Sequence, residues 1–297
     1  MRRVKELVAA KDVYRAGYSG KNIRIALLDT GAVMRHPDLQ GRIVAFKDFV
    51  NGKRQCYDDN GHGSHISGIL CGTGAASRGA LSGMAPGAQL IILKVLDQYG
   101  NGNTQDVMRA LAWILQNRRQ YNIRLLNFSV GFVPGAQKDE QQRLLEKIDE
   151  IWDAGIMVIT AAGNNGPGRQ SITVPGISRK VVTVGACDDL GIENDRMPSG
   201  YSGRGPTQCC IVKPEILAPG TKIQSVCHRT SGYIEKSGTS MAAPVVCGAM
   251  ALALEKSPEL TPAALKLQLY RTVKHLPEPG YEKAWGLLQV DQLIKNL

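Results

Sequence analysis

The sequence lacks an uninterrupted apolar run of the roughly 18 residues that a membrane-spanning helix requires. Its first residues, Met1–Glu6, lead into charged and polar positions and not into the roughly 7–15 apolar residues of a secretory signal. We therefore expect no membrane association and a cytoplasmic location. The alternative is a secreted protein from which a leader has been removed.

The sequence also lacks the cysteine spacing of a zinc site, because its seven cysteines include no CxxC pair. An odd number of cysteines without a pairing pattern favours free thiols in a reducing compartment. Cys71 and Cys247 lie in apolar helical patterns, where a buried cysteine packs as a small hydrophobic residue. We predict no metal site from these residues.

No basic run in the chain is interleaved with aromatic residues, although the formal net charge is +10. Aromatic residues make up 5% of the chain, and its lysines and arginines are scattered. A solvated basic surface explains this charge, and attraction to acidic peptides or to nucleic acid is the alternative. We predict no nucleic-acid partner.

No repeat, low-complexity tract or Pro/Ser-rich linker divides the chain, so we expect one domain over residues 1–297. Residues 1–11 would be an N-terminal extension, with no inhibitory propeptide domain before Asp12. Short apolar runs alternate with helical patterns, which is typical of a parallel sheet with helices on both faces. The predicted fold class is α/β, a three-layer α/β/α arrangement with a mostly parallel central sheet.

The predicted strands are rich in Val, Ile and Leu with little alternation, as in strands covered on both faces. They are Ile23–Leu28, Leu90–Leu96, Leu125–Val130, Ile156–Ala161 and Val181–Val184. The predicted helices are His62–Cys71, Thr104–Gln116, Asp139–Ala154, Ser240–Glu255 and Pro262–Thr272. Thr104 is the predicted cap of its helix, and Thr261 before Pro262 predicts another helix start.

Polar residues follow the predicted strands at their carboxyl ends, where parallel sheets bind ligands. Asp29 follows the first strand, Ser129 ends the third and Asn164 follows the fourth. His62 and Ser240 begin predicted helices. These five side chains can therefore converge at one edge of the sheet.

Ser240 and His62 have the features of a nucleophile and its base. Ser240 begins a predicted helix, where a serine has a free hydroxyl and a backbone N–H that points outward. The alternative to a nucleophile is a serine that only caps the helix. His62 is flanked by Gly61 and Gly63, which allow another segment to approach closely. A packing histidine, or a metal pair with His65, is the alternative for His62. Because no HExxH pattern is present, we interpret His65 as structural.

Asp29 and Asn164 supply the other groups that peptide hydrolysis needs. A carboxylate after a buried strand requires a hydrogen-bonded partner, which a histidine provides, although an Asx turn is an alternative. The segment Asp29–Gly31 is also the signature of aspartic peptidases, but a second such carboxylate and a β-rich chain are not visible. The Asn164 amide can donate to an oxyanion, or it can belong to a turn at Asn165-Gly166.

Taken together, the order Asp29, His62, Ser240 and seven segments are informative. The segments are Leu28–Gly31, Gly61–His65, Gly238–Pro244, Ala162–Asn164, His36–Leu39, Ser202–Pro206 and Leu217–Gly220. On these residues the chain resembles the subtilisin family of serine peptidases from about Asp12 to Val290. The stretch Tyr57–Asn60 and the missing leader are similar to intracellular bacterial members of the AprX-like group. A GxSxG elbow is absent, which argues against an α/β-hydrolase.

The resemblance implies a serine endopeptidase that hydrolyses peptide or protein substrates through an acyl-enzyme on Ser240. His62 would act as general base and then as general acid, and Asp29 would hold its imidazole. Asn164 and the Ser240 N–H would form the oxyanion hole. No cofactor is implied.

The resemblance also implies that a substrate binds as an extended strand between two edges. One edge is formed by Ser129, Val130 and Gly131, and the other contains Gly100 and Gly102. A surface turn is the alternative for the two glycines of the second edge.

The primary pocket would combine the first edge with Ala161–Gly163, including Ala162, and with Thr173–Pro175. No carboxylate falls among these positions, so we expect broad specificity with a preference for apolar side chains before the scissile bond. The resemblance further implies that the peptide bond between Val174 and Pro175 is cis.

The chain departs from the family at the positions that bind calcium. Residues 74–82 do not reproduce the calcium-binding loop, and Asp38 matches one ligand position, which is not a site by itself. We therefore expect no metal to be required. Ser64 stands where threonine is usual, and Val130, where leucine is usual, would widen the pocket edge.

Two other functions share this fold. A catalytically silent protein that only binds is disfavoured by the intact set of Asp29, His62, Asn164 and Ser240. A transpeptidase or ligase forms the same acyl-enzyme but uses an amine in place of water. The sequence leaves this alternative open, and mass analysis of the products distinguishes joined peptides from free acids.

Overall fold

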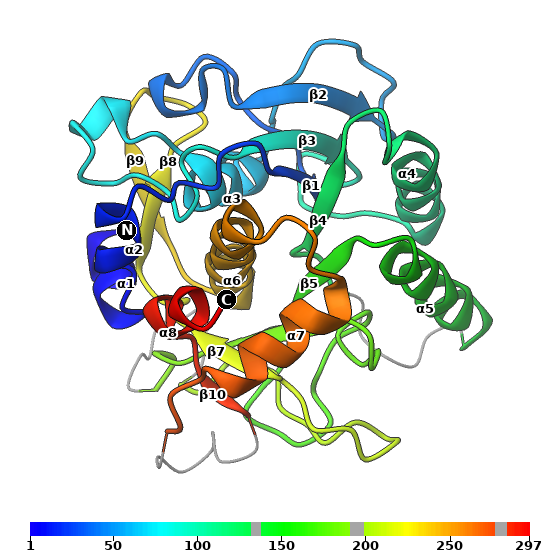
Figure 1. Cartoon of the computed structure of the whole chain (residues 1–297). Coiled ribbons are helices and arrows are strands. Elements are labelled where there is room, and N and C mark those ends of the chain that lie inside the picture. Colours follow the sequence, from blue (N-terminus) through cyan, green and yellow to red (C-terminus); the bar gives the residue numbers. More distant parts are fainter. Residues whose placement is uncertain (132–137, 191–198, 277–283) are drawn as a thin grey trace.

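The computed structural model describes residues 1–131, 138–190, 199–276 and 284–297. Within these residues a sheet of eight strands crosses the molecule, and helices lie against both of its faces (Figure 1). Its strands are β1 (Arg24–Asp29), β2 (Ile43–Asp48), β3 (Gln89–Lys94), β4 (Ile123–Phe128), β5 (Met157–Ala161), β6 (Val182–Ala186), β7 (Ile216–Ala218) and β10 (Gly286–Leu287). A separate antiparallel pair consists of β8 (Ile223–Val226) and β9 (Tyr233–Lys236).

The strands of the large sheet are parallel and lie in the order β10-β7-β6-β5-β4-β1-β3-β2. After β1 the chain adds β2 and β3 on one side of it, and β4 begins the other side. Parallel sheets bind ligands beyond the carboxyl ends of their strands at such a reversal. Asp29 is the last residue of β1 and Ser129 directly follows β4, so the fold places both residues at this point.

Helices form a layer on each face of the sheet (Figure 1). One face is covered by α3 and α6, which pack against each other, and the opposite face by α4 and α5. The helices of the described residues are α1 (Arg2–Leu7), α2 (Lys11–Arg15), α3 (His62–Cys71), α4 (Thr104–Asn117), α5 (Lys138–Asp153), α6 (Thr239–Lys256), α7 (Pro262–Arg271) and α8 (Val290–Lys295), with 3-10 turns at Pro37–Leu39 and Ala75–Ser77. None of these helices is both long and apolar enough to cross a membrane.

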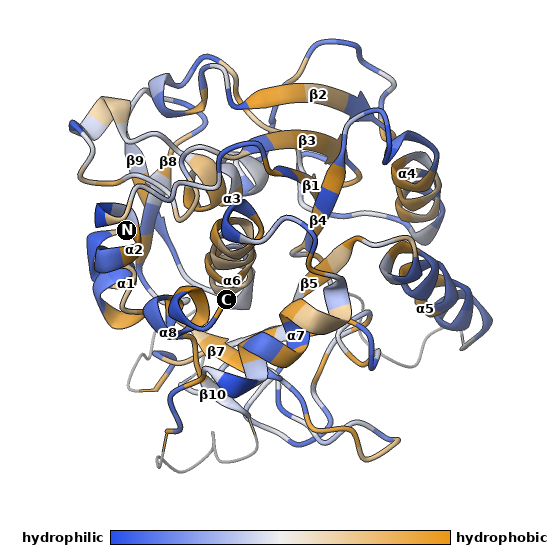
Figure 2. Cartoon of the chain, viewed as in Figure 1, coloured by the Kyte–Doolittle hydropathy of each residue, from blue (hydrophilic) through white to orange (hydrophobic). Residues whose placement is uncertain are grey.

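Alternate residues of each central strand fill the two cores. Ile25 and Leu27 of β1 pack with α3 and α6, whereas Ala26 and Leu28 pack with α4 and α5. Both faces are covered, which explains why these strands are apolar along almost their whole length. Figure 2 shows hydrophobic colour along the strands and hydrophilic residues on the visible side of α5. The predicted three-layer α/β fold is confirmed.

Each predicted strand and helix is present, with its ends shifted by at most two residues. The prediction that Thr104 caps α4 is wrong. Asn103 occupies that position and its side-chain oxygen accepts the Asp106 N–H at 2.8 Å, since asparagine caps a helix at least as well as threonine. Thr261 caps α7 as predicted, because its hydroxyl accepts the Ala264 N–H at 3.2 Å.

Candidate active site

A buried carboxylate holds a histidine at the carboxyl end of β1. Asp29 is fully buried, and its two oxygens lie 2.7 and 2.9 Å from Nδ1 of His62, the first residue of α3. The His62 side chain is 24% exposed, so solvent reaches the ring but not its partner. Because the buried carboxylate requires a donor, the contact places the proton of a neutral imidazole on Nδ1.

Two glycines permit this close approach. Gly31 has a φ of +117°, and a Cβ there would lie 1.9 Å from the carbonyl oxygen of Tyr57. A Cβ on Gly63 would lie 2.1 Å from the carbonyl oxygen of Gly31 and 3.1 Å from Asp29 Oδ1. Side chains at these positions would push α3 away from β1, so the glycines on this interface are required by its geometry.

A second buried carboxylate, Asp58, connects the end of β1 to the start of α3. Its Oδ1 accepts the Thr30 hydroxyl at 2.9 Å and the N–H groups of Asn60 and Gly61 at 3.1 and 2.7 Å. Its Oδ2 accepts the Ser64 N–H and hydroxyl at 2.8 and 2.6 Å. These hydrogen bonds lower the pKa of Asp58 even though its burial alone would raise it.

Thr30 completes this connection, since its hydroxyl oxygen also accepts the Gly63 N–H at 2.9 Å. Asp58 therefore positions both partners of the Asp29–His62 pair, one through Thr30 and the other through α3. This role of Asp58 is not among those predicted from the sequence. The available signal was a carboxylate four residues before a helix start, where acidic side chains satisfy free backbone N–H groups.

A buried cation lies on the other side of the same turn. Lys94 is fully buried, and its ammonium donates to the carbonyl oxygens of Thr30 and Leu96 at 2.7 and 2.8 Å and to Asp59 Oδ1 at 2.7 Å. It is the sheet partner of Asp29 in the β1–β3 register. Lys94 thus fixes the backbone after Asp29, and it too was absent from the predicted site.

Ser240 is the second residue of α6 and is half-buried. Its hydroxyl donates to the carbonyl oxygen of Ser129 at 3.1 Å, and no hydrogen bond among the described residues joins it to His62. Pro244 has no N–H to offer the Ser240 carbonyl one turn earlier, and the Ser129 hydroxyl donates to that carbonyl at 3.5 Å. Ser129 therefore ties the loop after β4 to the start of α6.

Asn164 lies beside the start of α6 with its amide orientation fixed. Its Oδ1 accepts both the N–H and the hydroxyl of Thr239 at 3.0 Å. A backbone N–H can only donate, so the oxygen must face Thr239 and the NH₂ group must face away. That NH₂ group lies against Gly238, where an added Cβ would be 3.3 Å from Nδ2. The amide of an exposed residue is thus available next to Ser240.

The segments predicted to form the primary pocket meet around Thr173. A Cβ on Gly131 would lie 2.3 Å from the Thr173 hydroxyl oxygen, and one on Gly163 would lie 2.5 Å from its methyl carbon. The Thr173 N–H donates to the carbonyl oxygen of Ala162 at 3.0 Å. Thr173 is 5% exposed, and its hydroxyl has no partner among the described residues.

Two further predicted lining residues lie around this point. Val130 is half-buried and packs against the core on the α4–α5 face. Pro175 is buried, and the Val174–Pro175 peptide bond is cis as the resemblance implies.

The second predicted edge forms a turn near α3. The Asp97 N–H donates to the carbonyl oxygen of Asn101 at 2.8 Å, and the Gly100 N–H to that of Asp97 at 3.1 Å. Gly100 has a φ of +82°, and Gly102 packs so closely that a Cβ would lie 2.8 Å from the carbonyl oxygen of Val95. The turn lies near His62, because the Asn60 amide donates to the Gln98 carbonyl oxygen at 3.1 Å.

Asp38 is buried, and protein donors engage both of its oxygens. The Ala76 N–H and the Tyr233 hydroxyl each donate to it at 2.9 Å. Within the described ranges, no group of three or more His, Cys, Asp and Glu side chains gathers as a metal site would require. Asp38 here serves the packing of the turn at 75–77.

His65 and the cysteines have surroundings that fit structural roles. The His65 ring is buried, with Nε2 3.0 and 3.1 Å from the carbonyl oxygens of Ile223 and Ile234. Burial, assisted by the nearby positive charge of Lys236, lowers the pKa of His65 to about 3. All seven cysteines are free, and Cys71 and Cys247 are fully buried in α3 and α6.

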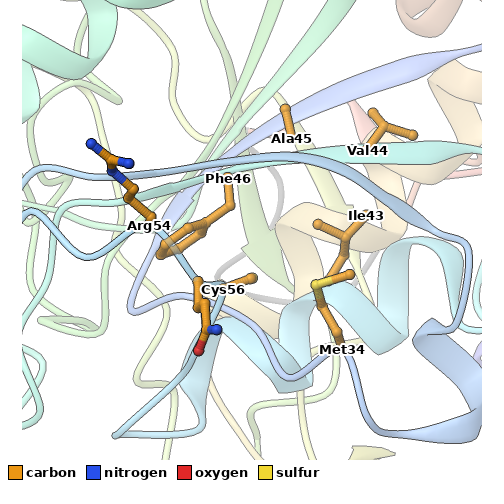
Figure 3. Close-up of a pocket in the computed structure, with 8 residues that line it drawn as sticks. Met34, Ile43, Val44, Ala45, Phe46, Arg54 and Cys56 are labelled. Carbon is orange, nitrogen blue, oxygen red and sulfur yellow. The ribbon is translucent and has the colours of Figure 1, made fainter.

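A hollow of about 470 Å³ lies at the edge strand β2 (Figure 3). Figure 3 shows the side chains of Met34 and Ile43 close together in it, while Arg54 extends away from them. Arg54 is the one charged residue among those that line it, which are Met34, Ile43, Val44, Ala45, Phe46, Arg54, Gln55 and Cys56. No predicted site residue is among them, so this hollow offers no chemistry comparable to that around His62.

A histidine oriented by a buried carboxylate, a serine at a helix start and a free amide beside it are the parts of a serine-type peptidase. The chain belongs to the subtilase family, whose sequence model, described as "Subtilase family", matches residues 20–287. It is 41% identical over 279 residues to "Serine protease AprX" of Bacillus subtilis (strain 168), which covers 86% of this chain and 63% of that protein. It is 31% identical over 287 residues to "Subtilisin DY" of Bacillus licheniformis, and this match covers 96% of this chain and 95% of that protein.

Solved structures agree with this assignment. "Sphericase" superposes with a TM-score of 0.79 at 27% identity, over 92% of this chain and 93% of the other. A cold adapted subtilisin-like serine proteinase superposes with a TM-score of 0.75 at 27% identity, over 92% of this chain and 90% of the other. The expected family and the class of serine-type endopeptidase are thereby confirmed at the level of the family.

Proposed function

We propose that this chain hydrolyses peptide bonds, with Ser240 as nucleophile, His62 as general base and Asp29 as the group that orients the imidazole. The main support is the contact of 2.7 Å between Asp29 Oδ1 and His62 Nδ1 at the end of β1. The neighbouring strand β4 leads into Ser129, whose carbonyl oxygen accepts the Ser240 hydroxyl. Neighbouring strands lie about 4.8 Å apart, so the starts of α3 and α6 converge on one small area.

The Ser240 hydroxyl donates to the Ser129 carbonyl oxygen, and rotation about Cα–Cβ releases it. Its oxygen then bonds to the substrate carbonyl carbon while its proton passes to His62 Nε2. The amide C–N bond breaks as that proton is given to the leaving amine. Water repeats the sequence on the ester, and a free acid and Ser240 are regenerated.

The negative charge that develops on the substrate oxygen requires donors that are already oriented. The Asn164 NH₂ group is directed outward by Thr239, and the Ser240 N–H forms no hydrogen bond with a described residue. The Ser240 N–H belongs to the start of α6 and the Asn164 amide lies beside it, where the helix dipole favours an anion. The chain's own residues supply every group in this scheme, so we propose that catalysis needs no cofactor.

The surroundings of Thr173 support a broad preference for apolar side chains before the scissile bond. The atoms nearest to Gly131 and Gly163, on the side where a Cβ would lie, all belong to the uncharged Thr173. A series of peptides that differ only at this residue tests the preference. We expect Leu and Phe to exceed Lys and Glu in kcat/KM.

Seven free cysteines support the further proposal that the protein acts in a reducing compartment such as the cytoplasm. Fractionation of the source cells with an antibody to the protein tests this location.

Labelling with a fluorophosphonate, which reacts with activated serines, tests the central proposal. The wild type is compared with Ser240→Ala and with Ser257→Ala, a change at the opposite end of the same helix. We expect label on the wild type and on Ser257→Ala only, and a loss of about 10⁶-fold in peptide hydrolysis for Ser240→Ala, as in subtilisin. Equal labelling of Ser240→Ala would exclude Ser240 as the nucleophile.

A further inference from the structure

Basic residues gather on one side of His62, and we refer to Arg35, His228, Arg229 and Lys236 as the basic rim. His228 and Arg229 lie in the turn between β8 and β9, and Lys236 ends β9. The Arg35 guanidinium donates to the His228 carbonyl oxygen at 3.2 Å and so joins the rim to the segment after β1.

The basic rim contacts the start of α3 directly. The His228 ring lies so close to Gly61, the residue before His62, that a Cβ on Gly61 would be 2.0 Å from His228 Nδ1. Burial and the positive charges of Arg229, Lys236 and Arg35 lower the pKa of His228 although Asp58 opposes them. His228 is therefore a neutral ring at neutral pH, and the positive charge of the rim belongs to its arginines and lysine.

Lys236 is the member of the basic rim whose charge interacts with Asp29. It is half-buried, lies four residues before Ser240, and interacts electrostatically with Asp58, Asp29 and the buried His65. Its ammonium makes no hydrogen bond or ion pair with any residue that the structure describes. Burial lowers the pKa of Lys236, and the more weakly acting Asp58, Asp29 and Cys227 do not offset the loss of water around the ammonium. A carboxylate that entered here would stabilise it.

The nearby acidic side chains do not fill this role. Asp29 is engaged by His62, and Asp58 accepts hydrogen bonds from both ends of the β1–α3 connection. Glu235 is adjacent to Lys236 in β9, so its side chain points to the opposite face of the hairpin. The rim thus retains a positive charge that faces the site.

The basic rim lies on the side of the site where the leaving-amine half of a bound peptide would lie. Ser129 and Asn164 follow β4 and β5, and in Figure 1 the β8–β9 hairpin lies on the other side of α3, which packs on β8. The acyl half of a substrate must lie with the oxyanion donor and the Ser129 edge. The leaving amine takes its proton from His62 and so departs on the histidine side, toward the rim.

We infer that the basic rim selects acidic side chains in the first two residues after the scissile bond, with Lys236 as the main determinant. This inference rests on the proposed function and adds the substrate class, peptides that are acidic on the leaving-group side.

Matched quenched fluorescent peptides test the inference. They share one apolar acyl half and carry Glu, Gln or Lys at the first or second position after the scissile bond. We expect kcat/KM for Glu to exceed that for Gln by about tenfold at low salt, and Lys to be the poorest. The Glu-to-Gln ratio should decline as salt rises from 20 mM to 500 mM, because the charges are partly exposed.

Substitution then assigns the effect to the rim. Lys236→Met keeps the apolar stem and should reduce the Glu-to-Gln ratio to about twofold or less. Lys21→Met removes the same charge from an exposed turn at the amino end of β1 and should leave the ratio unchanged.

Different results would contradict the preference for acidic residues and the peptidase activity itself. A ratio near one in the wild type, with efficient cleavage of the Gln peptide, would overturn the inference and leave the peptidase intact. An equal ratio in the wild type and Lys236→Met would exclude Lys236. Absence of cleavage of every peptide, together with absence of fluorophosphonate labelling, would overturn the proposed function itself.

Discussion

Replacement of Asp58 by Asn tests whether this carboxylate positions the Asp29–His62 pair. An asparagine retains one oxygen to accept from Thr30 and Gly61, but its NH₂ group would face the Ser64 N–H, which cannot accept. Two hydrogen bonds to an ionised group are lost, each worth about 1.5–3 kcal/mol, and one buried N–H is left without a partner. Because the Ser64 hydroxyl can rotate to accept instead, we expect a net loss of about 2–4 kcal/mol in the free energy of unfolding.

Urea unfolding measures this loss, with Ser240→Ala present in every protein so that unfolded chains are not digested. Asp12→Asn is the matched control, since the Asp12 side chain is exposed and pairs with the exposed Arg15. In the active protein, we expect kcat to fall about 10- to 100-fold for Asp58→Asn with little change in KM, because the substitution disturbs orientation.

The effect of Asp58 should depend on pH in a defined direction. Its folded-state pKa is lowered, so its contribution is fully present above the unfolded value of about 3.9 and is lost as pH falls through the folded value. The stability difference between wild type and Asp58→Asn should therefore be constant from pH 7 to pH 5 and shrink below pH 4. A difference under 0.5 kcal/mol at pH 7, about the effect of an ordinary surface change, would refute the reasoning.

Three other changes have defined outcomes. Asn164→Ala should lower kcat by about 10²–10³-fold with little change in KM, the loss that removal of one oxyanion donor causes in subtilisin, and an unchanged kcat would exclude this donor. Gly61→Ala should lower the melting temperature by several degrees, because φ is +97° and its Cβ would meet His228, and an unchanged melting temperature would contradict the packing described. In native protein, a thiol reagent followed by peptide mapping should modify exposed Cys209 but not Cys71, since burial raises the pKa of Cys71 to about 12, and early modification of Cys71 would indicate an open α3.

The sequence predicts best those strands that are buried on both faces. β3 and β5 consist mostly of apolar residues, so composition alone identifies them. β2 is an edge strand in which every residue except the buried Asp48 is partly or largely exposed, and β7 and β10 have only three and two residues. Their formation depends on the strand beside them, which a local pattern does not contain.

The residues of the candidate site likewise fall into those that the sequence indicates and those that depend on the fold. Asp29, His62, Asn164 and Ser240 lie in short segments whose residue types and order, taken together, indicate the chemistry, although each residue alone has another explanation. Asp58 and Lys94 act only through partners that the fold brings to them. A lysine at the end of an apolar run indicates the end of a strand, and nothing local shows that its ammonium is fully buried under Thr30.

The parallel order of the large sheet has a consequence for synthesis. β1 lies between β3 and β4, which leave the ribosome well after it, and the proposed nucleophile at residue 240 follows the proposed base at residue 62 by more than half of the chain. Closing such long loops is slow, so these contacts form late. With the proposed roles, a growing chain has no nucleophile–base pair until residue 240 has been added, which protects the unfinished protein from its own hydrolytic activity.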